Sequence, residues 1–153
     1  MKMRLKDEDL QRLITPSVLG SKGIASKRLK KVILDKIYRN AQLSYLYTFN
    51  IIHSPVSELE PIIATKPHSS CLYAQNVIKG PFPAGERAIA ENALYSLLYA
   101  RYVIKSPFPE GEVIISNHPL FKSDYLKFLG SINQEPTHPE LFDQIFVAQT
   151  PSS

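Results

Sequence analysis

The side chains that could perform acid–base or nucleophilic chemistry are three evenly spaced glutamates, four scattered histidines and one cysteine. Glu60, Glu86 and Glu112 follow one another at intervals of 26 residues. A pair of carboxylates brought together in space could act as general acid and general base. Each of these glutamates stands at the expected start of a short helix, where a negative charge faces the positive helix end. We therefore interpret them as helix-start residues and expect no catalytic role for them.

Among the remaining candidates, the histidines could act as metal ligands and the cysteine could act as a nucleophile. The histidines lack the short spacings of metal-binding motifs and are typical of helix ends or of the surface; they are His53, His68, His118 and His138. Cys71 falls at a repeat position where apolar or small residues predominate, which favours a packed thiol. The patterns HExxH, CxxC, GxxxxGK[ST], GxGxxG and GxSxG are missing. We expect no enzyme, no cofactor and no metal, although acids distant in sequence could still meet in space.

Basic side chains recur with the same interval as the glutamates. The expected long helix of each repeat is apolar around most of its circumference and leaves one narrow polar stripe. We call the residues of this stripe the basic ladder: Gln75, Lys79, Arg101, Lys105 and Lys127. Stacked repeats would align them on one surface that could engage acidic side chains or phosphates. The same pattern is typical of any solvated helix that ends in lysine, and both interpretations stand.

A second basic group lies in the N-terminal third. The net charge of +4 hides an asymmetry, because residues 1–54 carry eleven Lys and Arg against four acids, whereas residues 55–153 carry seven against ten. The densest stretch contains Lys27, Arg28, Lys30 and Lys31. Such a segment can meet nucleic acid or an acidic protein surface, or it can be the solvated face of a helix.

An internal repeat sets the positions of all these residues. Phe82-Pro83-Ala84-Gly85-Glu86 returns 26 residues later as Phe108-Pro109-Glu110-Gly111-Glu112, and the blocks 55–80 and 81–106 match at many further positions. A third copy runs from Pro107 to about Leu129, and a degenerate fourth copy begins near Leu29. A unit of this size cannot bury its own apolar face, so successive units must stack.

Each unit is predicted to contain two helices. The first is short, about Glu58–Ala64 and its equivalents, and Ser57 to Glu60 matches a capping box. The second, about Leu94–Lys105, has an apolar face that includes Tyr99. We expect the rings of Tyr73, Tyr99 and Tyr125 to stack along one buried or half-buried row. Gly80 is expected to take a left-handed conformation where the second helix ends.

The expected fold is therefore all-α: a short superhelical array of about four two-helix repeats with a capping helix at each end. Residues 1–28 form a basic N-terminal cap and joint, residues 29–131 the repeat array, and residues 132–153 a C-terminal capping helix and tail. Together they make one domain.

The sequence motif YAxxVIKGxFPEGExAIA resembles that of a known repeat family. Its residues here are Tyr73-Ala74, Val77 to Gly80, Phe82-Pro83, Gly85-Glu86 and Ala88 to Ala90. The phrase resembles a short repeat of uncharacterised bacteriophage and prophage proteins and is more loosely similar to variant leucine-rich repeats built from paired short helices. The likeness covers about residues 54–130. It implies a helical repeat fold and a phage origin, and it carries over no activity and no functional residue.

Two functions of different class follow. One is a non-enzymatic interaction protein that binds another protein, in the phage case as an inhibitor or modulator of a host or defence protein. The alternative is a nucleic-acid-binding protein that uses the N-terminal basic segment and the ladder. A single cysteine excludes an intramolecular disulfide and fits the cytoplasm, which would be the host cytoplasm for a phage protein. No apolar run is long enough to span a bilayer, so no membrane association is expected, and the sequence leaves the oligomeric state open.

Overall fold

The structure is a computed structural model that describes residues 6, 8, 12, 14 and 27–147, with the backbone alone at 27–30 and 144–147. Every regular element within residues 27–147 is helical and none is a strand, which confirms the all-α prediction. The expected N-terminal helix lies almost entirely outside the described residues. The expected joint at Gly20–Gly23 and the tail at Pro151–Ser153 lie wholly outside them.

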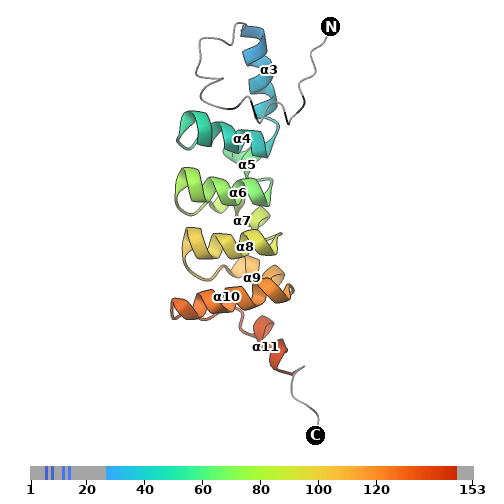
Figure 1. The fold of residues 1–153 in the computed structure, drawn as a ribbon, viewed down its shortest axis with the longest axis vertical. Helices are drawn as coiled ribbons and strands as arrows, with labels where there is room; N and C mark the ends of the chain where they lie inside the picture. Colours follow the sequence, from blue (N-terminus) through green and yellow to red (C-terminus); the bar gives the residue numbers. More distant parts are fainter. Residues whose placement is uncertain (1–5, 7, 9–11, 13, 15–26, 148–153) are drawn as a thin grey trace.

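Four long helices lie side by side along the long axis of the molecule, each against the next (Figure 1). The first three are short α-helices that widen into a π-helical turn, and only the fourth is α-helical throughout. They are α4 (Ala41–Tyr47) with η1 (Thr48–Ile52), α6 (Pro67–Tyr73) with η2 (Ala74–Ile78), α8 (Ala93–Leu98) with η3 (Tyr99–Ile104), and α10 (Pro119–Ser131). The sequence analysis did not predict the π turns.

Short helices connect the long ones, and a further helix stands at each end of the described chain (Figure 1). Prolines open most of them, as expected from a residue that needs no amide partner in a first helical turn. The connecting helices are α5 (Glu60–Ile63), α7 (Pro83–Ile89) and α9 (Pro109–Ser116), and the end helices are α3 (Lys27–Ile37) and α11 (Glu140–Val147).

A serine in the first turn of each of the first three long helices binds the end of the helix before it. The hydroxyls of Ser70 and Ser96 donate hydrogen bonds of 3.0 Å to the backbone oxygens of Ile63 and Ile89. Ser44 makes the equivalent bond of 2.6 Å in the degenerate first unit. All three serines are fully buried. These bonds satisfy carbonyls that a helix end would otherwise leave without a partner.

The tyrosine row is buried as predicted, and its hydroxyls tie each unit together. Tyr73, Tyr99 and Tyr125 are all 0% exposed. The Tyr99 hydroxyl accepts a 2.9 Å bond from the backbone amide of Phe82 and donates a 2.7 Å bond to Glu86. The same pattern recurs in the other two units: the Tyr73 hydroxyl donates to the Glu60 carboxylate at 3.0 Å, and the Tyr125 hydroxyl donates to the Glu112 carboxylate at 2.9 Å.

The tyrosine rings do not stack on one another, which corrects the expected arrangement. Phenylalanines stand between them, with ring centroids 5.1 Å apart and edges facing rings in the pairs Tyr73–Phe82 and Tyr99–Phe108. The offset geometry suits the quadrupole of aromatic rings. The capping-box expectation was also wrong, because the Ser57 hydroxyl bonds Glu58 and Leu59 caps α5 without a side-chain bond.

Gly85 and Gly111 let the short helices α7 and α9 approach the preceding long helices closely. A Cβ added to Gly111 would lie 2.5 Å from Cδ1 of Phe108 and 2.7 Å from the Ser96 side chain. Gly85 faces Phe82 and Ser70 at the same distances. The recurring glycine of the repeat therefore has a packing cause rather than a conformational one, since no described glycine has a positive φ.

The C-terminal helix α11 packs against the helices before it through side chains at the last positions of the 26-residue repeat. The fully buried carboxylate of Glu112 accepts hydrogen bonds from the backbone amides of Thr137 and His138 at 2.8 Å and 2.7 Å. Lys122, at the register of the three serines, reaches the backbone oxygen of Leu141 at 3.1 Å. The ring of Phe142 stacks on Tyr125, with centroids 5.6 Å apart, and ends the aromatic row. Helix α11 thus covers the end of the core, in the place where a capping helix was predicted.

Tyr99→Phe removes the hydroxyl and keeps the ring, so it measures the contribution of the hydroxyl alone. We expect it to lower the free energy of unfolding by about 1–3 kcal/mol, because the buried Phe82 amide and the Glu86 carboxylate lose their common partner. Tyr99→Ala, which also empties the ring site, should cost roughly 3–5 kcal/mol. Urea denaturation measures both. Equal stability of Tyr99→Phe and the wild type would show that the hydroxyl does not hold the unit together.

A pair of glycine variants tests the close packing. Gly111→Ala should lower the free energy of unfolding by about 1–3 kcal/mol, because Phe108 or Ser96 must move to admit the methyl group. Gly130→Ala is the control, since a Cβ there meets nothing within 4 Å and alanine favours the helix. The control should raise the free energy of unfolding by about 0.5–1 kcal/mol. Denaturant midpoints that move in the same direction for both variants would contradict this account.

Candidate binding surface

Lysines, and not glycines, occupy the left-handed position at the ends of the π turns. Lys79 has φ 59° and Lys105 has φ 53°, and His53 stands at the equivalent place with φ 57°. The prediction for Gly80 was wrong by one residue. The amides of Lys79 and Gly80 both bond the backbone oxygen of Ala74, so the helix closes on the lysine.

The two lysines present free charges to solvent. Both are exposed, and neither forms an ion pair with any residue that the structure describes. Turn η1 packs against η2, and η2 packs against η3, so the two lysines lie along one edge formed by successive units. We call this edge the π-turn edge and define it by the residues of η1, η2 and η3 with their caps His53, Lys79 and Lys105.

The other ladder residues are exposed as well but differ in their surroundings. Gln75 and Arg101 lie on η2 and η3, and the Arg101 guanidinium is 5.4 Å from the centre of the exposed Tyr102 ring. Lys127 lies on α10, which has no π turn, and its ammonium pairs with Asp124 at 3.7 Å. The ladder therefore holds three unpaired cations on the π-turn edge and a neutralised one beyond it.

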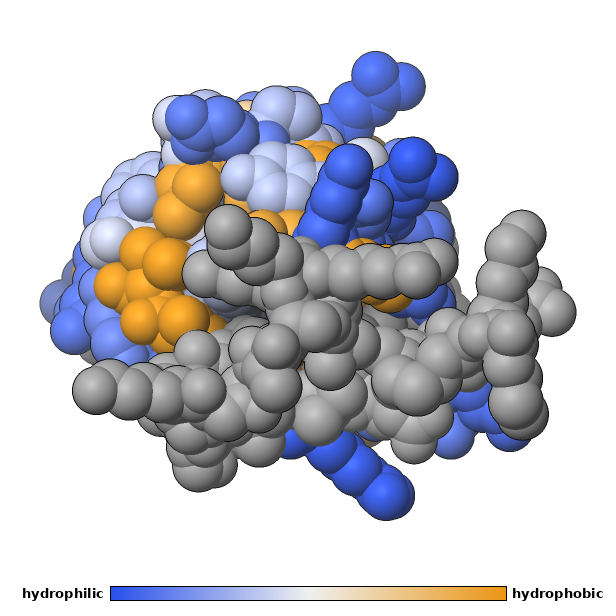
Figure 2. All heavy atoms as spheres, turned by 90° about the horizontal axis from the view of Figure 1, so that it is seen from above, coloured by the Kyte–Doolittle hydropathy of each residue, from blue (hydrophilic) through white to orange (hydrophobic). Residues whose placement is uncertain are grey.

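The edge is apolar where it begins. Phe49, at the register of Gln75 and Arg101, is 41% exposed, and Ile52 is 39% exposed. Seen from the N-terminal end, apolar atoms reach the surface on the side where the π turns lie (Figure 2). Apolar and basic groups thus share one edge, which suits an interface with an apolar core and a polar rim.

The N-terminal basic segment belongs to α3. Lys31 is exposed on this helix. The side chains of Lys27, Arg28 and Lys30 lie outside the described part of the structure. The described residues therefore do not place this segment beside the basic ladder.

The residues considered for catalysis have identified partners. Glu60, Glu86 and Glu112 each accept a tyrosine hydroxyl. Burial raises the pKa of Tyr73 to about 12, and the bond to Glu60 adds to the rise. Burial also raises the pKa of the Cys71 thiol to about 11, so the thiolate that a nucleophile requires is disfavoured.

The histidines occupy helix ends or pockets. His118 caps α10 and stacks on Phe121, and Nδ1 of His138 lies 3.5 Å from Glu140. Within the described residues no group of three or more His, Cys, Asp or Glu side chains could hold a metal ion. No helix in that part of the chain has the length and apolar content needed to cross a membrane.

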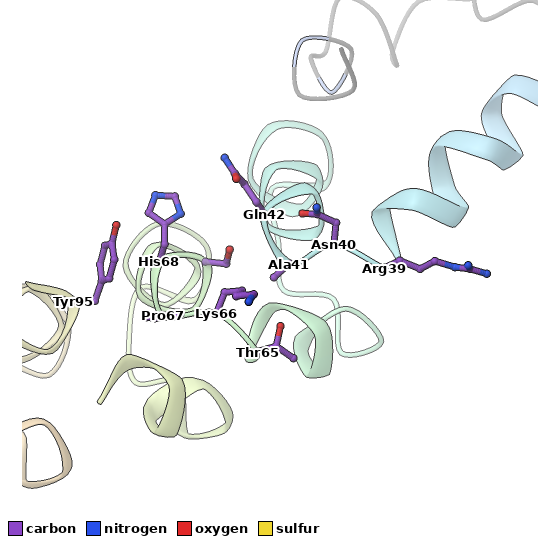
Figure 3. A pocket seen from close by; sticks show the side chains of 10 residues that line it. Arg39, Asn40, Ala41, Gln42, Thr65, Lys66, Pro67, His68 and Tyr95 are labelled. Atoms are coloured by element: carbon purple, nitrogen blue, oxygen red, sulfur yellow. The ribbon is translucent and has the colours of Figure 1, made fainter. Parts of the chain in front are cut away.

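A pocket at the opposite ends of the long helices was missed by the sequence analysis. It opens between the first turns of α4 and α6, and its lining includes Lys66, His68 and Ser69 (Figure 3). A signal for it exists in the repeat: Ser69 stands at the register of Leu43, Tyr95 and Phe121, where every other unit has a large side chain.

Comparison with known proteins assigns no role to these surfaces. No family model, no curated protein and no solved structure matches the chain. The resemblance to phage and prophage repeats stays an expectation from the sequence, and the geometry above is the basis for a functional proposal.

The buried tyrosines predict a loss of stability at high pH. Their folded-state pKa values lie above the ordinary value of 10.0 because burial disfavours the phenolate. The contribution of the buried tyrosines to the free energy of unfolding is fully present below about pH 10. It declines as the pH rises toward about 12, since the tyrosines then ionise freely only in the unfolded chain. Urea denaturation at about pH 8 and about pH 11 measures the effect. A free energy of unfolding that is the same at both pH values would contradict the burial of the hydroxyls.

Proposed function

We propose that the protein is a non-enzymatic interaction module that binds an acidic surface of another protein through its π-turn edge. The observation that carries the proposal is the left-handed conformation of Lys79 and Lys105. A residue with a Cβ costs about 1–2 kcal/mol in this conformation, and glycine would avoid the cost. Two successive units nevertheless keep a long cationic side chain there. Strain of this kind is retained where the side chain has a use.

The chemistry of the edge supports an acidic partner with an apolar centre. Lys79, Arg101 and Lys105 supply unpaired positive charges, which raise the rate of encounter with a negative surface. Phe49 and Tyr102 supply exposed aromatic area, and Tyr102 carries Arg101 over its ring. Aromatic residues and arginine are the residue types that contribute most binding energy at protein interfaces.

The proposal includes a specific arrangement and biological setting. The recurring serine, tyrosine and glycine contacts support stacking of about four units in a superhelical array, which would keep the edge rigid. The resemblance to phage and prophage repeats makes an inhibitor or modulator of a host or defence protein the particular form of the proposal. Inhibition would result from occupancy of the partner's surface.

The double variant Lys79→Gly/Lys105→Gly tests the edge without damaging the fold. Glycine relieves the left-handed backbone, while loss of each lysine removes about 0.3–1 kcal/mol of favourable interaction with the helix end. The free energy of unfolding should therefore stay level or rise. Affinity for the partner should fall by about tenfold or more, roughly 1.4 kcal/mol.

Affinity capture with nuclease treatment, followed by titration of the purified partner, provides the measurement. Arg39→Gln/Arg87→Gln is the matched control, because it removes two exposed charges outside the ladder. A double glycine variant that binds as tightly as the wild type would eliminate the edge as the binding site. Capture that nuclease abolishes, with affinity that falls steeply as salt rises, would favour the nucleic-acid alternative instead.

A further inference from the structure

The pocket between α4 and α6 has a defined origin in the repeat. Leu43, Tyr95 and Phe121 fill the corresponding position of the other units with a large side chain. Ser69 places a small hydroxyl there, and a pocket of about 490 Å³ opens beside it. Ligand pockets in proteins have volumes of roughly 300–1,000 Å³, so this space can hold a small organic molecule.

Two side chains of the pocket, Ser69 and Asn40, offer hydrogen-bond donors that bind no described residue. Ser69 is only 2% exposed, and its hydroxyl forms no hydrogen bond with any described residue. The oxygen of the Asn40 amide accepts the backbone amide of Leu43 at 3.0 Å, which leaves the amide nitrogen available. Because no fully buried side-chain oxygen or nitrogen among the described residues lacks a partner, the Ser69 oxygen is open to the pocket, where a ligand can accept its proton.

The charge of the pocket is positive. The Lys66 side chain extends into the space between α6 and α4 (Figure 3), and no described residue forms an ion pair with it. Arg39 stands at the rim, with its side chain directed away from the pocket (Figure 3). No aspartate or glutamate lines the pocket. An ammonium, a hydroxyl and an amide nitrogen together suit an oxyanion.

An aromatic wall stands beside these donors. The rings of His68 and Tyr95 meet edge to face with centroids 5.5 Å apart, and both rings line the pocket. They come from neighbouring long helices, α6 and α8, and point to the same side (Figure 3). Aromatic faces and edges favour contact with a flat ring of a ligand.

We propose that this pocket binds a small organic anion whose carboxylate or phosphate group contacts Lys66 and Ser69 and whose flat ring contacts His68 and Tyr95. The site lies at the opposite ends of the long helices from the π-turn edge and does not depend on the protein-binding proposal. Carboxylate and phosphate share the oxyanion chemistry of the pocket, and the test below distinguishes them.

Titration of the full chain with three ring compounds tests the proposal. Phenyl phosphate and benzoate carry the two anionic groups, and benzyl alcohol is their neutral analogue. We expect saturable calorimetric binding of at least one anion at constant ionic strength, and binding of benzyl alcohol at least about tenfold weaker. The tighter of the two anions identifies the preferred group. Failure of both anions to saturate, or equal affinity for benzyl alcohol, would overturn the proposal.

Two variants locate the binding. Ser69→Leu restores the large residue of the repeat and should abolish binding while circular dichroism remains that of the wild type. Lys66→Met should weaken the anions by about tenfold or more and leave benzyl alcohol unchanged. Arg87→Gln, which removes an exposed charge outside both the pocket and the π-turn edge, is the control and should bind the anions as the wild type does. Unchanged anion affinity in Lys66→Met would refute the site even if Ser69→Leu did not fold.

Discussion

The buried tyrosine hydroxyl is the interaction on which the architecture depends. In each of the three clear repeats it accepts a backbone amide near the start of the unit and donates to the glutamate of the short helix, 17 and 13 residues away. Both partners lie far from the tyrosine in sequence, so the hydroxyl folds the 26-residue segment back on itself. The ring of the same tyrosine packs on the phenylalanine of the following segment. One side chain therefore closes a unit and joins it to its neighbour.

This buried row explains why the two ends of the long helices are free for other uses. The serine, glycine and tyrosine contacts hold the inner faces together and require the same residue types in successive units. The exposed side chains of the π-turn edge and the pocket-lining side chains of the first turns make none of these contacts. Both carry unfavourable features: lysines in the left-handed conformation on one side, and a serine in place of the large side chain of the other units on the other. Departures that cost packing or backbone energy are the places where function is expected.

The C-terminal cap reuses the chemistry of the repeat for a different purpose. Glu112 keeps its tyrosine bond but also accepts two backbone amides ahead of α11, and its burial is complete. Lys122 replaces a serine and spans the gap to the same helix, with its ammonium 5.6 Å from the Phe142 ring. The array ends because these two residues bind a helix that stands outside the 26-residue register. Burying a lysine is tolerated here because its charge has a carbonyl and an aromatic face as partners.

The periodicity could be predicted from local properties of the chain, apolar spacing and proline placement, and with it the helical class, the buried tyrosine positions and the start of α11. It also assigned the ladder residues to two repeat registers, Gln75 with Arg101 and Lys127, and Lys79 with Lys105, but it did not fix their conformation. Whether Lys79 or Gly80 adopts a positive φ depends on which backbone amide reaches the Ala74 oxygen, and the widening of each helix into a π turn shifts that choice by one residue. The partners of Glu60, Glu86 and Glu112 and the pocket beside Ser69 exist only between segments distant in the chain. These features follow from the tertiary structure, because neither the partner of a hydrogen-bonding group nor the space left by a missing side chain can be identified in the sequence before the neighbouring segments are packed.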